Sequence, residues 1–402
     1  MTEDFFEKLL NFGSDWKVEK VVVNDLNEVN IFLKFDLPEY KKQHIESYEF
    51  VHDYLNYRRW RHLDIMQYKT FINAKIPRIK HKDSKIESAK VPWAQSGKHH
   101  THLFEIFAID LLLATKNQTK TAQILRCGFN LINKIMHNAT QRGLERRDTD
   151  TIYKQLCIDE KSFKKGHKYA TVLSDPEKGI ILEVEKDRTK KATKSLLNNT
   201  LSEHQISKVE TISLDMWKSY NTAVDEIIPK AKKVHDRFHL IKYLNEAVDK
   251  VRKREVKKNE VLRNSRYALL KNKYNLTVKQ HFKFEEVLRA NTEVSYVWRL
   301  KESFKSLFGC EDYQEASSRL SDWNSFVLWE GIPELTKVAR MFTNHITGVC
   351  NALVEKTSNA MAERLNGKIQ IIKTVGRGYR TFKNFRSAIL FFNGGLNLYP
   401  LN

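Results

Sequence analysis

Hydrophobic and polar positions change their spacing along the chain. In Lys20–Phe35 (KVVVNDLNEVNIFLKF) two alternating runs flank an Asn-Asp turn, which predicts a β-hairpin, and Tyr68–Ile79 predicts a further strand. From about residue 101 the apolar positions recur at helical spacing. We therefore expect a small β-containing module over residues 1–100 and helices over residues 101–148.

The helical segment predicts one long helix, a break around Lys116–Thr119, and two shorter helices near Lys120–Arg126 and Asn130–His137. The turn between the short helices contains Cys127 and Gly128. This spacing is that of a helix-turn-helix, whose second helix enters the major groove of DNA. Helix pairs with a glycine turn also occur as plain connectors, so both interpretations stay open at this point.

Strand and helix patterns alternate after residue 146. Three consecutive strands, a helix, a strand ending at Asp215, a helix, a short strand and a long helix from Arg237 follow one another. Helical spacing then continues to residue 350, and the chain closes with a helix carrying Glu363, a basic turn at Gly376–Tyr379 and an apolar helix. This order predicts an α/β core of ribonuclease-H-like type over residues 149–250 and 351–402, with an all-α insertion over residues 251–350.

The charge balance narrows the class of partner. Lys and Arg number 69 against 49 Asp and Glu, a formal net charge of +20. Such an excess favours a polyanion, although RNA or a membrane surface would suit the total as well as DNA. No apolar run reaches the roughly 18–20 residues that span a bilayer, so we expect no membrane segment and a cytoplasmic, nucleoid-associated protein.

Basic residues gather in four stretches that could contact DNA. The alternative for each stretch is an ordinary solvated face, the more frequent role of a charge run. For the second half of the long helix that begins near Arg237, the sequence slightly favours the DNA-contacting role over the solvated face, because Glu255 is the only acid after Asp249. The candidate DNA-contacting residues are Arg58, Arg59, Arg61, Lys120, Arg126, Asn130, Lys134, Lys250, Arg252, Lys253, Arg254, Lys257, Lys258, Arg377 and Arg380.

Three carboxylates stand out by their position. Asp159 is expected to end the first strand of the α/β core, Asp215 ends the fourth, and Glu363 lies on the late helix. Carboxylates are the protein ligands that Mg²⁺ prefers, and two such ions can support phosphodiester cleavage. The simpler interpretation of Asp215 is a helix N-cap, since Asp is a preferred capping residue.

Four blocks of the sequence resemble the signature blocks of bacterial insertion-sequence transposases of the ISL3 family. They are IDEKSFKKGHKY, SLDMWKSY, VHDRFHLIKYLNEAVDKVR and TSNAMAERLNGKIQIIKTVGRGYRTFKNFR, and RRWRHLD and VPWA in the first module add to them. The resemblance implies a ribonuclease-H-like core with an Asp-Asp-Glu triad at Asp159, Asp215 and Glu363. It also places Asp236 and His239, the Asp-x-x-His pair in HDRFH, near the site. Their alternative roles are a helix cap and a helix-start histidine.

The sequence departs from the family in the first module. Family members commonly carry cysteine pairs for zinc there, whereas this chain has its four cysteines at positions 127, 157, 310 and 350. His81 alone cannot form a tetrahedral site, so zinc is not expected. The missing cysteines leave end recognition and full transposition competence as open questions.

The hypothesis at this stage is a DNA transposase that acts as a homodimer. It would bind the terminal inverted repeats of an insertion sequence, hold Mg²⁺ (with Mn²⁺ as an alternative ion) on the triad, nick the double-stranded element ends and join the freed 3′-hydroxyl to target DNA. Two alternatives remain: a related nuclease without strand transfer, and a catalytically inactive or domesticated relic that acts as a sequence-specific DNA-binding protein.

Overall fold

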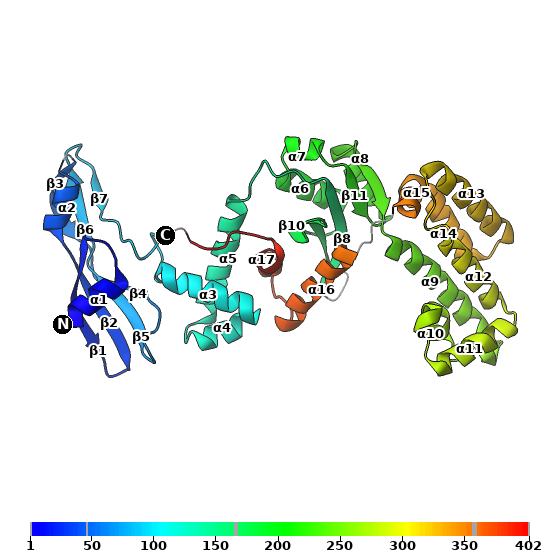
Figure 1. Cartoon of the computed structure of the whole chain (residues 1–402), viewed down its shortest axis with the longest axis horizontal. Helices are drawn as coiled ribbons and strands as arrows, with labels where there is room; N and C mark the ends of the chain where they lie inside the picture. Colours follow the sequence, from blue (N-terminus) through cyan, green and yellow to red (C-terminus); the bar gives the residue numbers. More distant parts are fainter. Residues whose placement is uncertain (1, 46, 165–167, 356–359, 401–402) are drawn as a thin grey trace. The chain divides into compact units, whose positions relative to one another are not determined.

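A computed structural model describes residues 2–45, 47–164, 168–355 and 360–400 of the chain (Figure 1). Contacts divide the chain into two compact units. Unit 1 is residues 1–147 together with 396–402, and unit 2 is residues 148–395. The finer division into five segments stays a prediction. Within the described residues, no helix combines the length and the apolar character needed to cross a membrane.

Unit 1 begins with two small sheets. The first sheet has the strand order β1-β2-β5-β4, and the second has the order β3-β6-β7. The predicted hairpin is confirmed as β1 and β2, which pair antiparallel from Trp16↔Phe35 to Val23↔Val29. The elements are α1 (Thr2–Leu10), β1 (Trp16–Val23), β2 (Glu28–Phe35), α2 (Leu37–Gln43), β3 (Tyr48–Tyr54), β4 (Arg58–Arg61), β5 (Lys69–Ala74), β6 (Pro77–His81) and β7 (Ile86–Ser88).

The single strand predicted over Tyr68–Ile79 is wrong. The segment forms two strands, β5 and β6, which belong to different sheets. Pro77 begins β6, and proline suits the first residue of a strand because it has no N–H to donate to a ladder. The chain therefore leaves one sheet at Ala74 and enters the other at Pro77.

An aromatic cluster forms the core of this β module. Trp93 lies edge-on to Trp16 and Trp60, with ring centroids 4.9 and 5.4 Å apart, and all three side chains are buried. Edge-to-face packing is a favourable arrangement of aromatic rings, and each indole buries a large apolar area. The two small sheets are therefore built on side chains that are large enough to form a core in a short segment.

Three helices complete unit 1: α3 (His102–Thr115), α4 (Gln118–Ile124) and α5 (Phe129–Glu145). The predicted break is confirmed, since Lys116 ends α3 in a left-handed conformation (φ +54°) and Asn117 caps α4 by accepting a bond from the Lys120 N–H. The second short helix is longer than predicted, because Met136, Ala139 and Gly143 continue its buried face. The helix-turn-helix itself stays a prediction.

Unit 2 contains a mixed five-stranded sheet with the order β10-β9-β8-β11-β12. Strands β8, β9 and β10 pair antiparallel, whereas β11 pairs parallel with β8 on one side and β12 on the other. Figure 1 shows α6 and α8 on one side of this sheet and α16 and α17 on the other. The elements are β8 (Gln155–Lys164), β9 (Lys168–Asp175), β10 (Ile180–Lys186), α6 (Lys190–Thr200), α7 (Glu203–Ser207), β11 (Thr211–Leu214), α8 (Lys218–Ile227), β12 (Lys232–His235), α16 (Ala360–Val375) and α17 (Phe382–Asn393).

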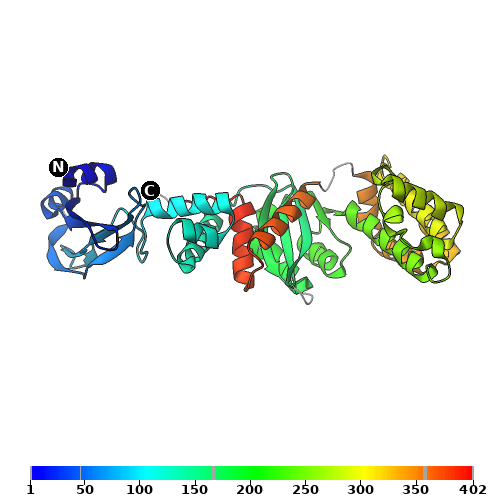
Figure 2. The ribbon, with the colours of Figure 1, turned by 90° about the horizontal axis from the view of Figure 1, so that it is seen from below.

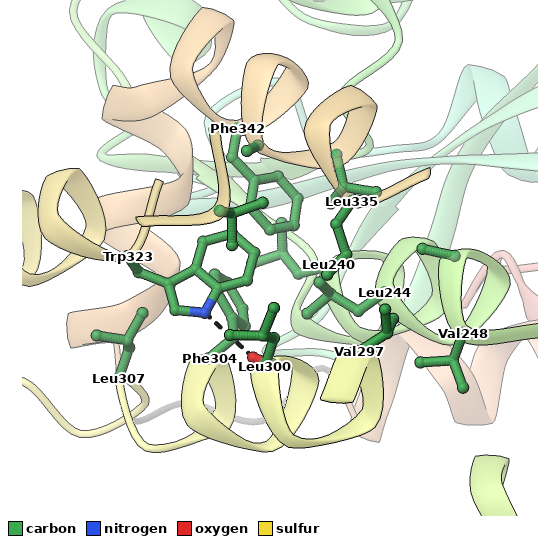
Figure 3. Close-up of a cluster of buried hydrophobic side chains, with 14 of the residues drawn as sticks. Leu240, Leu244, Val248, Val297, Leu300, Phe304, Leu307, Trp323, Leu335 and Phe342 are labelled. Atoms are coloured by element: carbon green, nitrogen blue, oxygen red, sulfur yellow. Dashed lines mark hydrogen bonds between the residues drawn. The ribbon is translucent and has the colours of Figure 1, made fainter. Parts of the chain in front are cut away.

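The helices between β12 and α16 form a bundle, which Figure 2 shows from another side. Its core collects Phe304, Trp323 and Phe342, whose rings lie 5.0–6.2 Å apart (Figure 3). The Trp323 indole N–H donates to the Leu300 carbonyl at 3.1 Å, so the buried polar atom is satisfied. The helices are α9 (Arg237–Glu255), α10 (Arg266–Leu270), α11 (Val278–Arg289), α12 (Glu293–Lys305), α13 (Tyr313–Glu330), α14 (Pro333–Asn344) and α15 (Ile346–Val354), with short 3₁₀ turns at Glu260–Leu262 and Lys273–Asn275.

Candidate active site

The parallel part of the sheet brings three acidic residues into one row. The register pairs Leu214 of β11 with Ile158 of β8 and with His235 of β12. The residue that follows each of these three paired positions is an aspartate, so the row reads Asp159, Asp215, Asp236. Neighbouring strands are separated by about 4.8 Å, so the row concentrates carboxylates at the carboxyl edge of β11.

Asp159 does not end its strand, which corrects the sequence-based expectation. Strand β8 continues to Lys164 because its antiparallel pairing with β9 extends past the point where β11 ends. The Asp159 carboxylate accepts a bond from the Glu160 N–H at 2.6 Å and from the Asn366 amide, and it lies 3.4 Å from the Lys161 ammonium. Asp159 therefore lies in the middle of β8, next to the point where β11 ends.

Asp215 is not the cap of the helix that follows it. Trp217 occupies the N-cap position of α8, and no side chain caps that helix. The Asp215 carboxylate instead accepts bonds from the Met216 N–H at 2.7 Å and from the Tyr243 hydroxyl at 3.3 and 3.4 Å. His239 Nδ1 lies 3.1 Å from Asp215 Oδ2, an ion-pair distance, although its direction is not that of a good hydrogen bond.

The surroundings of Asp215 favour its charged form. Burial alone raises the pKa of this carboxyl, but His239, with smaller contributions from Met216 and Tyr243, holds the pKa below its usual value. Burial likewise lowers the pKa of His239, and Asp215 more than reverses that effect, so the pKa of the imidazole is raised. The two pKa shifts agree, because each favours the charged form of its group. Asp215 and His239 therefore form a partly buried pair of a carboxylate and an imidazole.

The Asp-x-x-His element divides into two roles. Asp236 caps α9 by accepting a bond from the Phe238 N–H at 2.8 Å, so the capping alternative is confirmed for this residue. His239, one turn into α9, contacts Asp215 and is therefore more than a helix-start residue. The pair consequently holds the start of α9 against the acidic row.

Glu363 lies on α16, and its side chain is outside the described residues. The orientation of the helix is known from its neighbours, because the Asn366 amide donates to Asp159 and the Lys373 ammonium donates to the Ser162 carbonyl at 2.7 Å. Residues three apart on a helix share a face. Glu363 precedes Asn366 by three residues on α16, and its role at the site stays a prediction.

The donor chemistry at this edge suits a hard divalent cation. Asp159 and Asp215 are adjacent carboxylates from neighbouring strands, the ligand type that Mg²⁺ and Mn²⁺ accept. Within the described part of the chain, no three His, Cys, Asp or Glu side chains converge as a metal-binding group. A third ligand would complete the set, and Glu363 of α16 stays the predicted candidate.

Sequence reasoning missed three residues that support the acidic row. Tyr243 and Asn366 contact the aspartates directly. Arg188 lies between the rings of Tyr169 and Trp217, at 4.2 and 4.5 Å, and donates to Glu160 at 2.8 Å. Helical spacing could have found the first two, since Tyr243 lies four residues after His239 and Asn366 three after Glu363. No sequence signal identifies Arg188.

The predicted DNA-contacting residues of the first module differ in accessibility. Arg61 is only 7% exposed, and its guanidinium donates to the His62, Thr70 and Leu125 carbonyls and to Asp64, so it holds the fold together and we withdraw it from the interface. Arg59 is exposed but pairs with Glu28 at 2.8 Å. Arg58 is half-buried.

The helix pair of unit 1 presents three of its four predicted contacts freely. Lys120, Asn130 and Lys134 are exposed, and the last two lie four residues apart on one face of α5. Arg126 is exposed as well, but it donates to the Gln67 carbonyl at 2.7 Å and to Asp64. Its first role is therefore to attach the helix pair to the β module.

The basic candidates of unit 2 also separate into two groups. Arg252 and Lys253 pair with Asp249 at 2.7 and 2.9 Å, and Arg254 pairs with Glu293 and Glu334. The remaining candidates are exposed and make no ion pair with any described residue; they are Lys250, Lys257, Lys258, Arg377 and Arg380. Ion pairing within the bundle thus leaves fewer cations for DNA than the sequence suggests.

The family model for ISL3-type DDE transposases, described as a transposase, matches residues 156–389, more than half of the 402 residues. The chain belongs to the ISL3 transposase family. The matched segment begins three residues before Asp159 and ends within α17, so it includes the acidic row, the helical insertion and all of α16. The resemblance inferred from the four sequence blocks is thereby confirmed.

Curated relatives of this transposase carry the same description. It is 26% identical over 352 residues to the transposases for insertion sequence element IS1557 of Mycobacterium tuberculosis strains CDC 1551 / Oshkosh and H37Rv, a match that covers 81% of this chain and 79% of each relative. It is 25% identical over 286 residues to the transposase for IS1001 of Bordetella parapertussis, covering 69% of this chain and 70% of the relative. The similarity therefore extends across both units.

Proposed function

We propose that this transposase cuts the ends of its insertion sequence and joins them to target DNA with one site, formed by Asp159, Asp215 and Glu363. The observation that carries the proposal is the register that places Asp159 and Asp215 side by side at the open end of β11. The antiparallel and parallel strand order, with helices on both faces, supports a ribonuclease-H-like core. The contact of Asn366 with Asp159 supports Glu363 as the third acid.

Each residue has a defined task in this proposal. Asp159, Asp215 and Glu363 would hold Mg²⁺ or Mn²⁺, which supplies a polarised phosphate and an activated oxygen nucleophile when bound. Tyr243 and the backbone N–H of Met216 orient the Asp215 carboxylate, and Asn366 orients Asp159. The surroundings of Asp215 hold its pKa below the usual value and so favour its carboxylate form.

Binding of the terminal inverted repeats is assigned to unit 1. The exposed face of α5 that carries Asn130 and Lys134 suits the major groove, and the net charge of +20 suits a DNA backbone. The exposed cations Lys250, Lys257 and Arg377 of unit 2 would contact phosphates nearer the cut. Because two ends must be brought together, we expect a homodimer in the active complex.

A cleavage assay on a labelled duplex that carries the element's own terminal repeat tests this function. Wild-type protein with Mg²⁺ should cut at the repeat boundary, and Asp215→Asn and Glu363→Gln should bind the repeat with near wild-type affinity without cutting it. Loss of binding in Glu363→Gln would assign Glu363 to the fold instead of the site. Cleavage that persists in Asp215→Asn would refute the triad.

The same assay separates the two alternatives. A nuclease without strand transfer would cut but would not join the 3′ end to a supercoiled target plasmid. A DNA-binding relic would bind the repeat tightly and cut it in neither Mg²⁺ nor Mn²⁺. The contacts that orient Asp159 and Asp215 favour the enzyme over the relic, because a relic has no use for oriented carboxylates.

A further inference from the structure

A groove of about 370 Å³ runs along α9, the helix that contacts Asp215. Phe238, Lys242, Asn245, Asp249 and Lys253 line it, and their spacing of three or four residues places them along one side of the helix. The opposite side of α9 carries Leu240, Leu244 and Val248 into the bundle core (Figure 3). The groove side is therefore the surface that the fold leaves open.

One end of the groove comes close to the active site, because the ring of Phe238 lies edge-on to the ring of His239, with centroids 5.7 Å apart. Phe238 and Lys242 immediately precede His239 and Tyr243, the two residues of α9 that contact Asp215. From Phe238 the groove side extends to Lys253, a distance of about 22 Å at 1.5 Å per residue. A chain bound along this side would therefore come close, at one end, to the His239 side chain that contacts Asp215.

The charge of the groove suits a phosphate backbone. Lys242, Lys250, Lys253 and Arg266 line it, against Glu246 and Asp249. Asp249 is 7% exposed and already neutralised, since Lys253 and Arg266 lie 2.9 and 3.6 Å from its carboxylate. Lys242 and Lys250 are exposed, and the described residues give neither an ion pair.

Two further features suit nucleobases. The Phe238 ring is 58% exposed at the catalytic end of the groove, and Ile241 and Leu270 add apolar surface. Asn245 Oδ1 is buried and accepts no hydrogen bond from the described residues. Aromatic rings stack on unpaired bases, and the exocyclic amino groups of bases are donors that such an oxygen can accept.

We propose that this groove binds a short unpaired stretch of the DNA strand beside the cleaved bond, with phosphates at Lys242 and Lys250 and a base against Phe238. The size of the groove favours an unpaired strand, because about 370 Å³ matches a nucleotide or two and is too small to enclose a duplex. The proposal rests on the proposed function, since it assigns the occupant of a surface beside the same site.

The test compares two forms of the terminal repeat: a blunt duplex and the same duplex with four unpaired nucleotides at the cut end. Equilibrium binding is measured in EDTA, so that no cleavage occurs, for wild type, Phe238→Ala, Phe238→Trp and the double variant Lys242→Ala with Lys250→Ala. Lys337→Ala, an exposed lysine on α14 outside the groove, is the matched control.

Wild type and the Lys337→Ala control should bind the overhang form more tightly than the blunt form. Phe238→Ala should lose about tenfold in affinity for the overhang form only, the scale of one stacked base, and Phe238→Trp should restore it. The double lysine variant should lower the slope of log K against log salt by about 1.4 for the overhang form, because each single-strand phosphate contributes about 0.7.

Equal losses on both forms of DNA would show that the groove contacts duplex, and unchanged affinities in both variants would show that it contacts no DNA; either result overturns the proposal. The catalytic assignment is judged separately by the cleavage of Asp215→Asn. If wild type cleaves the repeat but the groove variants bind both forms of DNA like wild type, the groove proposal alone is refuted. If the groove variants lose affinity for the overhang form but wild type does not cleave, the catalytic function alone is refuted.

Discussion

The contact between Gly348 and His235 offers a quantitative test of how the acidic row is supported. Gly348 lies in the first turn of α15, and a Cβ atom placed there would lie 2.5 Å from His235 Cδ2 and 2.6 Å from Nε2. Ordinary carbon contacts are about 3.5–4.0 Å, so the imidazole would have to move by about 1 Å. His235 is 2% exposed, and its Nδ1 bonds the carbonyl of Leu214, the residue before Asp215, at 3.1 Å.

Gly348→Ala should therefore destabilise unit 2 and disturb the site. Overpacking of a rigid core costs about 1–3 kcal/mol, and a ring fixed by its own hydrogen bond belongs at the upper end. Alanine gains up to about 1 kcal/mol over glycine in a helix, so the net loss is about 2 kcal/mol. Gly367→Ala on α16 is the matched control, because a Cβ atom there meets nothing within 4 Å. Its free energy of unfolding should rise only by the helix propensity that alanine has over glycine.

Calorimetric unfolding compares the two alanine variants. Their difference, about 3 kcal/mol, should separate the transitions of unit 2 by about 6–12 °C. Adding His235→Ala to Gly348→Ala should recover part of the loss, which a double-mutant cycle would measure as coupling. Equal melting temperatures for Gly348→Ala and Gly367→Ala, or no coupling with His235, would refute the idea that the His235 ring fills the space between Gly348 of α15 and the Leu214 carbonyl.

Three further predictions concern other parts of the molecule. Phe304→Ala should cost about 3–5 kcal/mol in urea unfolding, because a fully buried ring leaves a cavity; a loss below 1 kcal/mol would contradict the packing in Figure 3. Burial raises the pKa of Glu105, but bonds from His100 and Arg142 lower it to about 2, so its stabilising effect is complete above pH 4.5 and is lost as the pH falls toward 2. The stability difference between wild type and Glu105→Gln should shrink over that range, and a constant difference would contradict the ion pairs. Arg61→Ala should lower the melting temperature, whereas Arg59→Ala should change only the salt dependence of DNA binding; the reverse pattern would return Arg61 to the interface.

Sequence reasoning anticipated the elements better than the contacts. The order of strands and helices in unit 2, the hairpin of β1 and β2 and the start of α9 at Arg237 could all be predicted, because periodicity and turn residues act locally. The single strand over Tyr68–Ile79 failed, since the choice between two sheets depends on distant partners. The end of β8 was misplaced for the same reason, because pairing with β9 carries it beyond Asp159.

The sequence by itself determined the positive charge of the chain and the family to which its signature blocks belong, and it predicted three acids for the site. Only the tertiary structure decided which charged side chains are free of internal partners and so remain available to bind DNA or a metal ion. Arg61 and Arg254 look like DNA contacts in the sequence but are held by internal partners, and Asp215 looks like a cap but bonds Tyr243 and faces His239. The physical reason is that pairing and burial depend on residues far apart in the chain, whereas charge and periodicity belong to each segment alone.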